Sequence, residues 1–164
     1  MLVQLEHVMK EYGSFALELN MQIPENQIIG LIGANGAGKS TTFKLMIGLI
    51  RPDQGNAEVF GRNAADLGAE EKQKIGVVFY DSGFSEYLRV QQLIPVMKRF
   101  YPDFQEKEFR KRCERFKIPL NKQIKDFSTG MKAKLNVLLA LSHDSRLLLL
   151  DEPTAGLDVV AREE

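Results

Sequence analysis

One run of eight residues has the composition of a loop that binds phosphate groups. Residues 33–40 read GANGAGKS and fit the pattern G-x-x-x-x-G-K-[S/T]. Glycines let backbone N–H groups approach a triphosphate closely, and a following helix adds the positive end of its dipole. Lys39 would place a cation on the β- and γ-phosphates, and the Ser40 hydroxyl would ligate Mg²⁺. The residues expected to hold the triphosphate are Asn35, Gly36, Ala37, Gly38, Lys39, Ser40 and Thr41.

A second candidate site follows an apolar run near the C-terminal end. Residues 146–150 (RLLLL) predict a buried parallel strand, and Asp151 and Glu152 come directly after it. Acids at this end of a strand project into the crevice where α/β sheets bind ligands. Asp151 is expected to hold Mg²⁺, through water because this ion keeps much of its hydration shell. Glu152 is expected to accept a proton from the attacking water, or to orient it.

The elements that must position these residues alternate between strands and helices. Apolar and polar residues alternate through 2–8 and 15–21, on either side of a turn at residues 12–14. The apolar run 28–32 predicts the strand that leads into the phosphate loop. The remaining predicted strands are 58–60, 75–79 and 146–150, and the predicted helices are 39–49, 69–73, 105–116 and 131–143.

Residues 85–140 differ from the rest because helix-forming patterns dominate them. Their first helix shows one apolar face with helical spacing, and Pro95 should kink this helix or lie near its first turn. We therefore predict an α/β fold with a P-loop NTPase core: a mixed sheet with flanking helices, N-terminal antiparallel strands and a helical lobe at about 85–140. The whole chain, 1–164, would form one domain. The face consists of Val90, Leu93, Ile94, Met97 and Tyr101.

Composition narrows the classes of partner. The 164 residues carry 22 Lys+Arg and 22 Asp+Glu, and this balance argues against nucleic acid as a partner. Cys113, the single cysteine, fits a reducing compartment and is interpreted as an ordinary helix residue. The apolar runs are too short to cross a membrane, and the N-terminal residues lack the pattern of a signal peptide. These features predict a cytoplasmic protein.

A third motif connects the two sites to a family. Residues 127–131 (FSTGM) resemble the L-S-G-G-Q signature of the ATP-binding cassette (ABC) ATPases, and they precede the acidic pair by about twenty residues, as in that family. Residues 151–158 (DEPTAGLD) are similar to its D-E-P-T-x-G-L-D run. Together with the phosphate loop, these motifs carry a resemblance that covers essentially the whole chain.

This resemblance implies a head-to-tail dimer, either of two copies or of this chain with a paralogous subunit. Each ATP would be enclosed between the phosphate loop of one subunit and the signature of the other. Ser128 and Gly130 would then contact the γ-phosphate held by the opposite subunit, and Asp158 would lie at the dimer seam. Tyr12 stands where the family places an aromatic residue that stacks on adenine, and the alternative is a strand-end tyrosine that only packs.

The chain departs from the family pattern at two places. In the signature, Thr129 and Met131 replace a glycine and the glutamine, and a similar S-x-G-M pattern occurs in drug- and peptide-exporting bacterial cassettes. In the Q-loop, Tyr80 stands where the family has a glutamine. Asp81 could replace it as a Mg²⁺ ligand or hold a water molecule, and the alternative is a simple loop acid.

The function implied is the ATP-binding and hydrolysing subunit of an ABC transporter, most similar to an exporter. A transmembrane permease subunit would hold it at the inner face of the plasma membrane. Phe84, Tyr87 and Leu88 could form an apolar groove for that partner, or could pack inside the lobe. The alternatives are a soluble ABC-type ATPase and an ATP-dependent interaction module with little hydrolysis.

The positions of the histidines bear on how fast the chain is expected to hydrolyse ATP. The family's switch histidine would follow Asp158 by some thirty residues, beyond position 164. His7 and His143 stand elsewhere and are expected to be structural or solvent-facing. We therefore expect a truncated cassette that binds ATP and hydrolyses it weakly.

Overall fold

A computed structural model describes residues 1–79 and 83–153 of the chain. The chain divides into two compact units, Met1–Lys72 and Gln73–Glu164, and each is described by itself. The predicted single domain over 1–164 stays a prediction.

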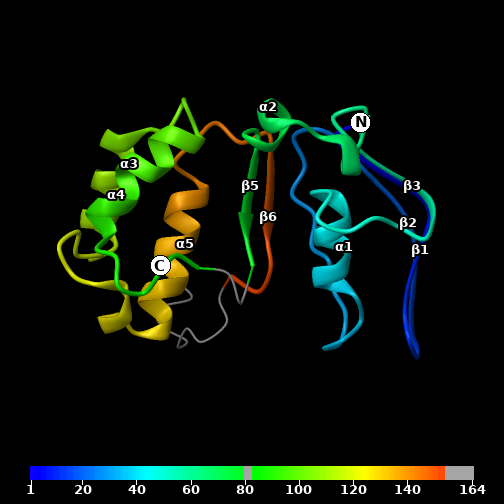
Figure 1. Cartoon of the computed structure of the whole chain (residues 1–164), viewed down its shortest axis with the longest axis horizontal. Coiled ribbons are helices and arrows are strands. Elements are labelled where there is room, and N and C mark those ends of the chain that lie inside the picture. The colour runs from blue at the N-terminus through cyan, green and yellow to red at the C-terminus, as the bar shows by residue number, and fades with distance from the viewer. Residues whose placement is uncertain (80–82, 154–164) are drawn as a thin grey trace. The chain divides into compact units, whose positions relative to one another are not determined.

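The first unit is built on an antiparallel sheet of four strands (Figure 1). In chain order these are β1 (Val3–Tyr12), β2 (Phe15–Ile23), β3 (Gln54–Val59) and β4 (Arg62–Asn63), arranged β2-β1-β3-β4. β1 and β2 form the predicted hairpin, in which Tyr12 lies opposite Phe15 and Gly13 takes a positive φ of 56° at the turn. A bulge at His7 interrupts the alternation of β1, and the His7 amide donates to Asn20 instead of the ladder.

Helix α1 (Lys39–Met46) accompanies this sheet in the first unit, and its Leu45 and Met46 are fully buried. It ends at Met46, three residues before the predicted end at residue 49, because Gly48 takes a positive φ of 68°. A Cβ atom at Gly48 would lie 2.0 Å from the Ala64 carbonyl oxygen, so no other residue fits there. The short 3₁₀ helix Ala64–Asp66 and helix α2 (Ala69–Lys72) complete the unit.

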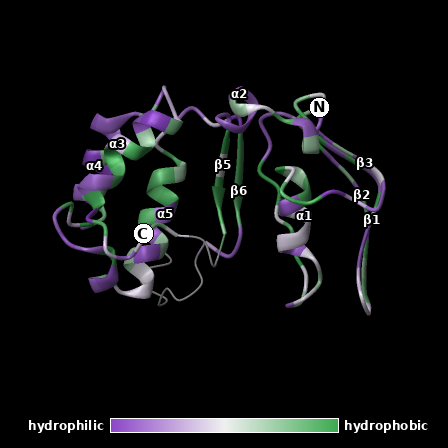
Figure 2. Ribbon diagram, viewed as in Figure 1, coloured by the Kyte–Doolittle hydropathy of each residue, from purple (hydrophilic) through white to green (hydrophobic). Residues whose placement is uncertain are grey.

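The second unit contains two parallel strands, β5 (Ile75–Val78) and β6 (Leu147–Leu150), paired from Ile75–Leu147 to Val78–Leu150. Figure 2 shows that both strands are hydrophobic along their whole length. This is the expected composition of strands that are covered on both faces.

The helical lobe predicted at 85–140 lies in this unit and has its own core. It comprises α3 (Val90–Phe100), α4 (Glu106–Arg115), the 3₁₀ helix Ile124–Asp126 and α5 (Thr129–Ala140). Phe109 and Cys113 of α4 are completely buried among residues of α3 and α5, whereas the rest of α4 is mainly hydrophilic (Figure 2). The apolar face predicted for α3 is confirmed, since Val90, Leu93, Ile94 and Met97 are buried.

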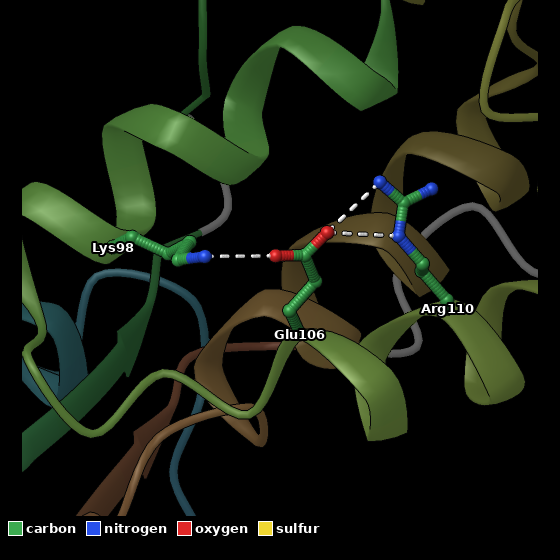
Figure 3. Close-up of polar contacts among 3 residues, drawn as sticks. All are labelled: Lys98, Glu106 and Arg110. Carbon is green, nitrogen blue, oxygen red and sulfur yellow. Dashed lines mark hydrogen bonds and ion pairs between the residues drawn. The ribbon is translucent and has the colours of Figure 1, made fainter.

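An ion-pair network joins α3 to α4 at the surface of the lobe (Figure 3). Lys98 and Arg110 each donate to the Glu106 carboxylate at 3.0 Å. These hydrogen bonds, that of Lys98 first, hold the pKa of Glu106 below its usual value.

Three expectations need correction. The strand predicted at 28–32 is wrong: the segment has no ladder, and Ile28 and Ile32 are 103% and 96% exposed. A strand exists only through backbone hydrogen bonds to a partner, and the strands of the first unit pair with one another. Of the two alternatives for Pro95, a place near the first turn of the helix is wrong, and a kink stays a prediction. Pro95 lies in the middle of α3, on the exposed face, where water can satisfy the carbonyl that proline leaves unpaired. Helix α5 begins at Thr129, two residues before the predicted Met131.

No helix formed by the described residues combines the length and the apolar composition that crossing a bilayer requires.

Candidate functional site

The phosphate loop forms a tight turn that ends directly in α1. Gly36 and Gly38 take left-handed conformations, with φ of 80° and 93°, and Gly38 is the N-cap of the helix. The Ala37 amide donates to the Ala34 carbonyl at 3.1 Å, which closes the turn. The first amides of α1 have no partner within their helix and carry the positive end of its dipole. The loop therefore runs directly into a helix N-terminus, as the sequence predicts, although no strand leads into it.

The loop is held in place by the β1–β2 hairpin of the same unit. A Cβ atom at Gly38 would lie 2.6 Å from Leu17 Cδ1 and 3.2 Å from Phe15 Cζ, both on β2. Gly38 is therefore required by close packing as well as by its backbone conformation.

Lys39 lies over the loop it follows. Its Nζ donates to the carbonyl oxygens of Gly33 at 2.9 Å and Ala34 at 3.0 Å. The ammonium group is thus held beside the loop, and the exposed Ser40 occupies the next position of α1. A cation, helix amides and a hydroxyl within one turn are a donor set that fits a triphosphate with Mg²⁺.

Tyr12 lies at the end of β1, in the same unit as the loop, and is 48% exposed. The Nζ atom of Lys10 lies over its ring, 5.6 Å from the centroid. Lys10 also donates to Asp53 Oδ1 at 2.7 Å. The hydrogen bond from Lys10 and then that from the Glu11 amide hold the pKa of Asp53 below its usual value.

The predicted acidic pair follows β6 in the second unit. Asp151 is only 6% exposed, and its amide donates to the Val78 carbonyl at the end of β5, at 2.8 Å. Glu152 is exposed and takes a φ of 49°, which is unusual for a residue with a Cβ atom. Strain of this kind clusters at functional sites because it aims a side chain in a fixed direction.

A cavity of about 440 Å³ opens beside these acids, within the second unit. Asp151 and Glu152 line it together with Lys132 and Asn136 of α5. Lys132 forms an ion pair with Glu86, which also lines the cavity. The acids and α5 therefore share one cavity.

The signature residues lie at the start of α5. Ser128 is the N-cap, and its Oγ accepts a hydrogen bond from the Met131 amide at 3.2 Å. The hydroxyl proton is then available to another acceptor. Gly130 is the second helical residue, so its amide belongs to the first turn, in which amides have no carbonyl partner within the helix.

The residues suggested for docking a permease have different environments. Phe84 and Leu88 are partly buried and pack against the core of the lobe, as the packing alternative predicted. Phe84 also lines the cavity beside the acids. Tyr87 is 72% exposed, with the Lys125 ammonium over its ring at 5.4 Å.

Two predicted site residues, Asp81 and Asp158, lie outside the described residues, as does Tyr80. His7 lies at an exposed bulge, whereas His143 is buried and stacks on Tyr101 with ring centroids 4.1 Å apart. Burial raises the pKa of the Cys113 thiol to about 11, which fits an unreactive core residue.

Sequence reasoning missed two ion pairs close to these sites, Lys10–Asp53 and Glu86–Lys132. The signal available was weak: Asp53 stands in a turn-forming run, and Lys132 directly follows the signature. Neither position indicates a partner more than forty residues away.

The phosphate loop before α1 and the acidic pair after a buried parallel strand define a nucleoside-triphosphate-binding α/β protein. A family model described as ABC transporter matches residues 17–155. The chain therefore belongs to the ABC transporter family, and ATP is the nucleotide that this family binds.

Curated relatives are named as ATP-binding proteins for transport or export. The chain is 30% identical over 166 residues to the bacitracin transport ATP-binding protein of Enterococcus faecalis, covering 99% of this chain and 54% of that protein. It is 31% identical over 169 residues to the Nod factor export ATP-binding protein I of Cupriavidus pinatubonensis, covering 98% of this chain and 52% of that protein. The chain thus spans about half the length of the curated relatives it matches.

Solved structures confirm the predicted fold class. An ATP-binding subunit of an ABC transporter matches with a TM-score of 0.84 and 26% identity, over 99% of this chain and 71% of that one. A dimeric, post-hydrolysis ATP-binding cassette bound to ADP and Pi matches with a TM-score of 0.80 and 24% identity, over 99% and 78% of the two chains.

Proposed function

We propose that this chain is the ATP-binding and ATP-hydrolysing part of an ABC transporter, most similar to an exporter. The observation that carries the proposal is the phosphate loop, in which the left-handed Gly38 caps α1 and the Lys39 ammonium is held beside the loop. Family membership supports ATP as the nucleotide. The relatives named for bacitracin transport and Nod factor export support transport as the process that hydrolysis drives.

The nucleotide would be held mainly by backbone groups. The amides of Asn35 to Thr41 would surround the phosphates, and the Lys39 ammonium would leave the loop carbonyls for the β- and γ-phosphates. The ring of Tyr12 would stack on adenine, and its exposure supports this role over simple packing.

Bound Mg²⁺ would neutralise charge on the phosphates. We propose Ser40 and Asp151 as its ligands, with Asp151 acting through water, and Asp81 as a further ligand or water-holder in place of the Q-loop glutamine. Glu152 would orient the attacking water and accept its proton. The backbone strain at Glu152 supports a functional role for its carboxylate.

The active form would be a head-to-tail dimer, with a second copy or a paralogous subunit. Ser128 and Gly130 of one subunit would contact the γ-phosphate bound by the other, and Asp158 would lie at the seam. The hydroxyl proton of Ser128, which its bond with the Met131 amide does not use, and the position of Gly130 in the first turn of α5 support this contact. Dimeric cassettes among the solved structures of this fold also support it.

The dimer would act on a transmembrane permease at the cytoplasmic face of the membrane. Tyr87, exposed beside Lys125, is the residue of the suggested cluster best suited to contact that partner. Phe84 would contribute through the cavity that it lines.

Binding and hydrolysis of MgATP by the purified chain test the proposal. Lys39→Ala should abolish measurable binding in calorimetry, whereas Lys44→Ala, which changes a lysine five residues further along α1, should leave binding unchanged. Equal affinities of Lys39→Ala and the original chain would contradict it. Binding without any hydrolysis, even with a permease present, would favour an interaction module.

The dimer has a separate test. Glu152→Gln should allow binding and block hydrolysis, so that ATP holds the dimer in sedimentation experiments. A further Ser128→Ala change should weaken this dimer, whereas Ser85→Ala should not. Monomers throughout a wide range of ATP concentration would count against the head-to-tail arrangement.

A further inference from the structure

A single aspartate connects the turn before β3 to three successive residues of β1. The Asp53 amide donates to the Met9 carbonyl at 2.8 Å. Its Oδ1 accepts from Lys10 Nζ at 2.7 Å, and its Oδ2 accepts from the Glu11 amide at 2.8 Å. The next residue of the chain is Tyr12.

These hydrogen bonds replace a strand that has ended. β3 pairs with β1 only as far as Met9, opposite Gln54, whereas β2 continues to pair with β1 up to Tyr12. The last residues of β1 therefore form an edge, and on one side no strand pairs with their backbone groups. The Asp53 carboxylate supplies the missing acceptor for the Glu11 amide and fixes the end of the strand.

Asp53 also fixes the side chain that lies against the Tyr12 ring. Lys10 and Tyr12 are two residues apart in a strand and so share one face of the sheet. The Lys10 side chain is 17% exposed, and its Nζ lies over the ring at 5.6 Å from the centroid. Ammonium groups within about 6 Å of a ring centroid are attracted to its face. The ring thus has a held cation on one face.

The same hairpin carries the phosphate loop. Tyr12 lies opposite Phe15, and Phe15 and Leu17 pack against the position of Gly38. The position of the Tyr12 ring relative to the loop is therefore set by a short, paired stretch of chain.

We propose that Asp53 is a positioning residue for nucleotide binding: through Lys10 and the Glu11 backbone it holds the Tyr12 ring in the orientation that stacks on the base of a triphosphate bound at residues 33–40. This inference rests on the proposed function. Asp53 does not contact the phosphates in this role, so it affects only the base-dependent part of the affinity. Without it, the competent orientation of the ring is populated for a smaller fraction of the time, and the apparent affinity falls by that fraction.

The test compares ATP with inorganic tripolyphosphate, which has the phosphates but no base, by calorimetry on the whole chain. Asp53→Ala should weaken ATP binding about fivefold and leave tripolyphosphate binding unchanged. Asp53→Asn keeps an acceptor for the Glu11 amide but loses the charge facing Lys10, so its effect should be smaller. Glu18→Ala removes an exposed acid from β2 and should change neither affinity.

A double-mutant cycle separates positioning from a general structural role. In a Tyr12→Ala background, Asp53→Ala should cause no further loss of ATP affinity. Because the chain contains no tryptophan, Tyr12→Trp also provides a fluorescent reporter at the stacking position. ATP should quench it, tripolyphosphate should not, and Asp53→Ala should reduce the quenching.

The outcomes are distinguishable. Equal losses of ATP and tripolyphosphate affinity, or no loss of either, would overturn the proposal for Asp53. Failure of the original chain to bind either compound would instead overturn the proposed function. If Asp53→Ala does not fold, Lys10→Met gives the same test: it should weaken ATP alone, and an unchanged ATP affinity would overturn the proposal.

Discussion

Single residues in this protein are constrained by backbone conformation as strongly as by chemistry. Gly38 combines a φ of 93° with a neighbour, Leu17 Cδ1, that a Cβ atom would meet at 2.6 Å. Gly36 has a similar φ of 80°, and apart from its chain neighbours no atom of the described residues lies within 4 Å of a Cβ position there. The two glycines of one loop therefore separate the cost of backbone strain from the cost of overlap.

Gly38→Ala should weaken binding of MgATP at least tenfold, because the methyl group must displace Leu17 as well as adopt a strained φ. Gly36→Ala should have the smaller effect. Adding Leu17→Ala should recover part of the affinity lost in Gly38→Ala, measured by calorimetry. No recovery would show that backbone strain alone explains the loss.

Glu152 adopts a left-handed backbone conformation, which is unfavourable for a residue with a Cβ atom. Glycine adopts this conformation without strain, so Glu152→Gly should be more stable than Glu152→Ala by about 0.5–1 kcal/mol. Urea unfolding measures the difference. At Glu114, inside α4, the order should reverse, because glycine costs about 1 kcal/mol relative to alanine in a helix. Alanine being better at both positions would contradict the strain.

At the scale of elements, the ends of helices and the joints between them matter most. α1 and α5 both begin at motifs, with Gly38 and Ser128 as their N-caps. In the lobe, Lys98 of α3 and Arg110 of α4 both donate to Glu106 of α4, so the bond from Lys98 connects the two helices (Figure 3).

Ser128→Ala should destabilise the second unit by about 1 kcal/mol, since it removes the acceptor for the Met131 amide. Ser128→Gly should cost only a few tenths of that amount. Both losses should appear without nucleotide, in urea unfolding. A stability unchanged by either substitution would mean that the cap hydrogen bond contributes nothing measurable.

The lowered pKa of Glu106 predicts the pH dependence of the lobe. Its ion pairs contribute fully above the ordinary glutamate pKa, and their contribution is lost as pH falls through the lower pKa of the folded state. Glu106→Gln should therefore lower the melting temperature at pH 7 but not at pH 3, and by a small amount because the pairs are at the surface.

At the scale of the whole molecule, the chain consists of two compact units that carry different candidate site residues. The phosphate loop and Tyr12 belong to Met1–Lys72, whereas the acidic pair and the signature belong to Gln73–Glu164. Each unit has its own sheet and its own buried residues.

MgATP at a hundred times its dissociation constant should stabilise the protein by about 2.7 kcal/mol. If heating resolves two transitions, MgATP should stabilise the one in which residues 33–40 unfold. Hydrogen exchange of the amides of residues 33–40 identifies that transition. Lys39→Ala should remove the shift. A shift that survives in Lys39→Ala would point to nucleotide bound elsewhere.

The sequence alone determined the local chemistry of this protein. The phosphate loop and the acids after β6 follow from residue types within a few positions of one another, because backbone conformation and neighbouring side chains set them. The cap at Ser128 was not predicted, since the helix was expected to begin at Met131. The apolar run 28–32 shows the limit of such reasoning: its composition suggested a strand, but composition names no partner for the ladder.

Only the tertiary structure decided which distant segments meet. It brought Asp53 to Lys10, 43 positions away, and paired β5 with β6 across the whole helical lobe. It also buried Phe84 and Leu88 partly in the lobe while leaving Tyr87 exposed. Such contacts depend on chain closure and on the sum of many weak packing interactions. Neither can be predicted from the residues that neighbour the contacting ones in the sequence.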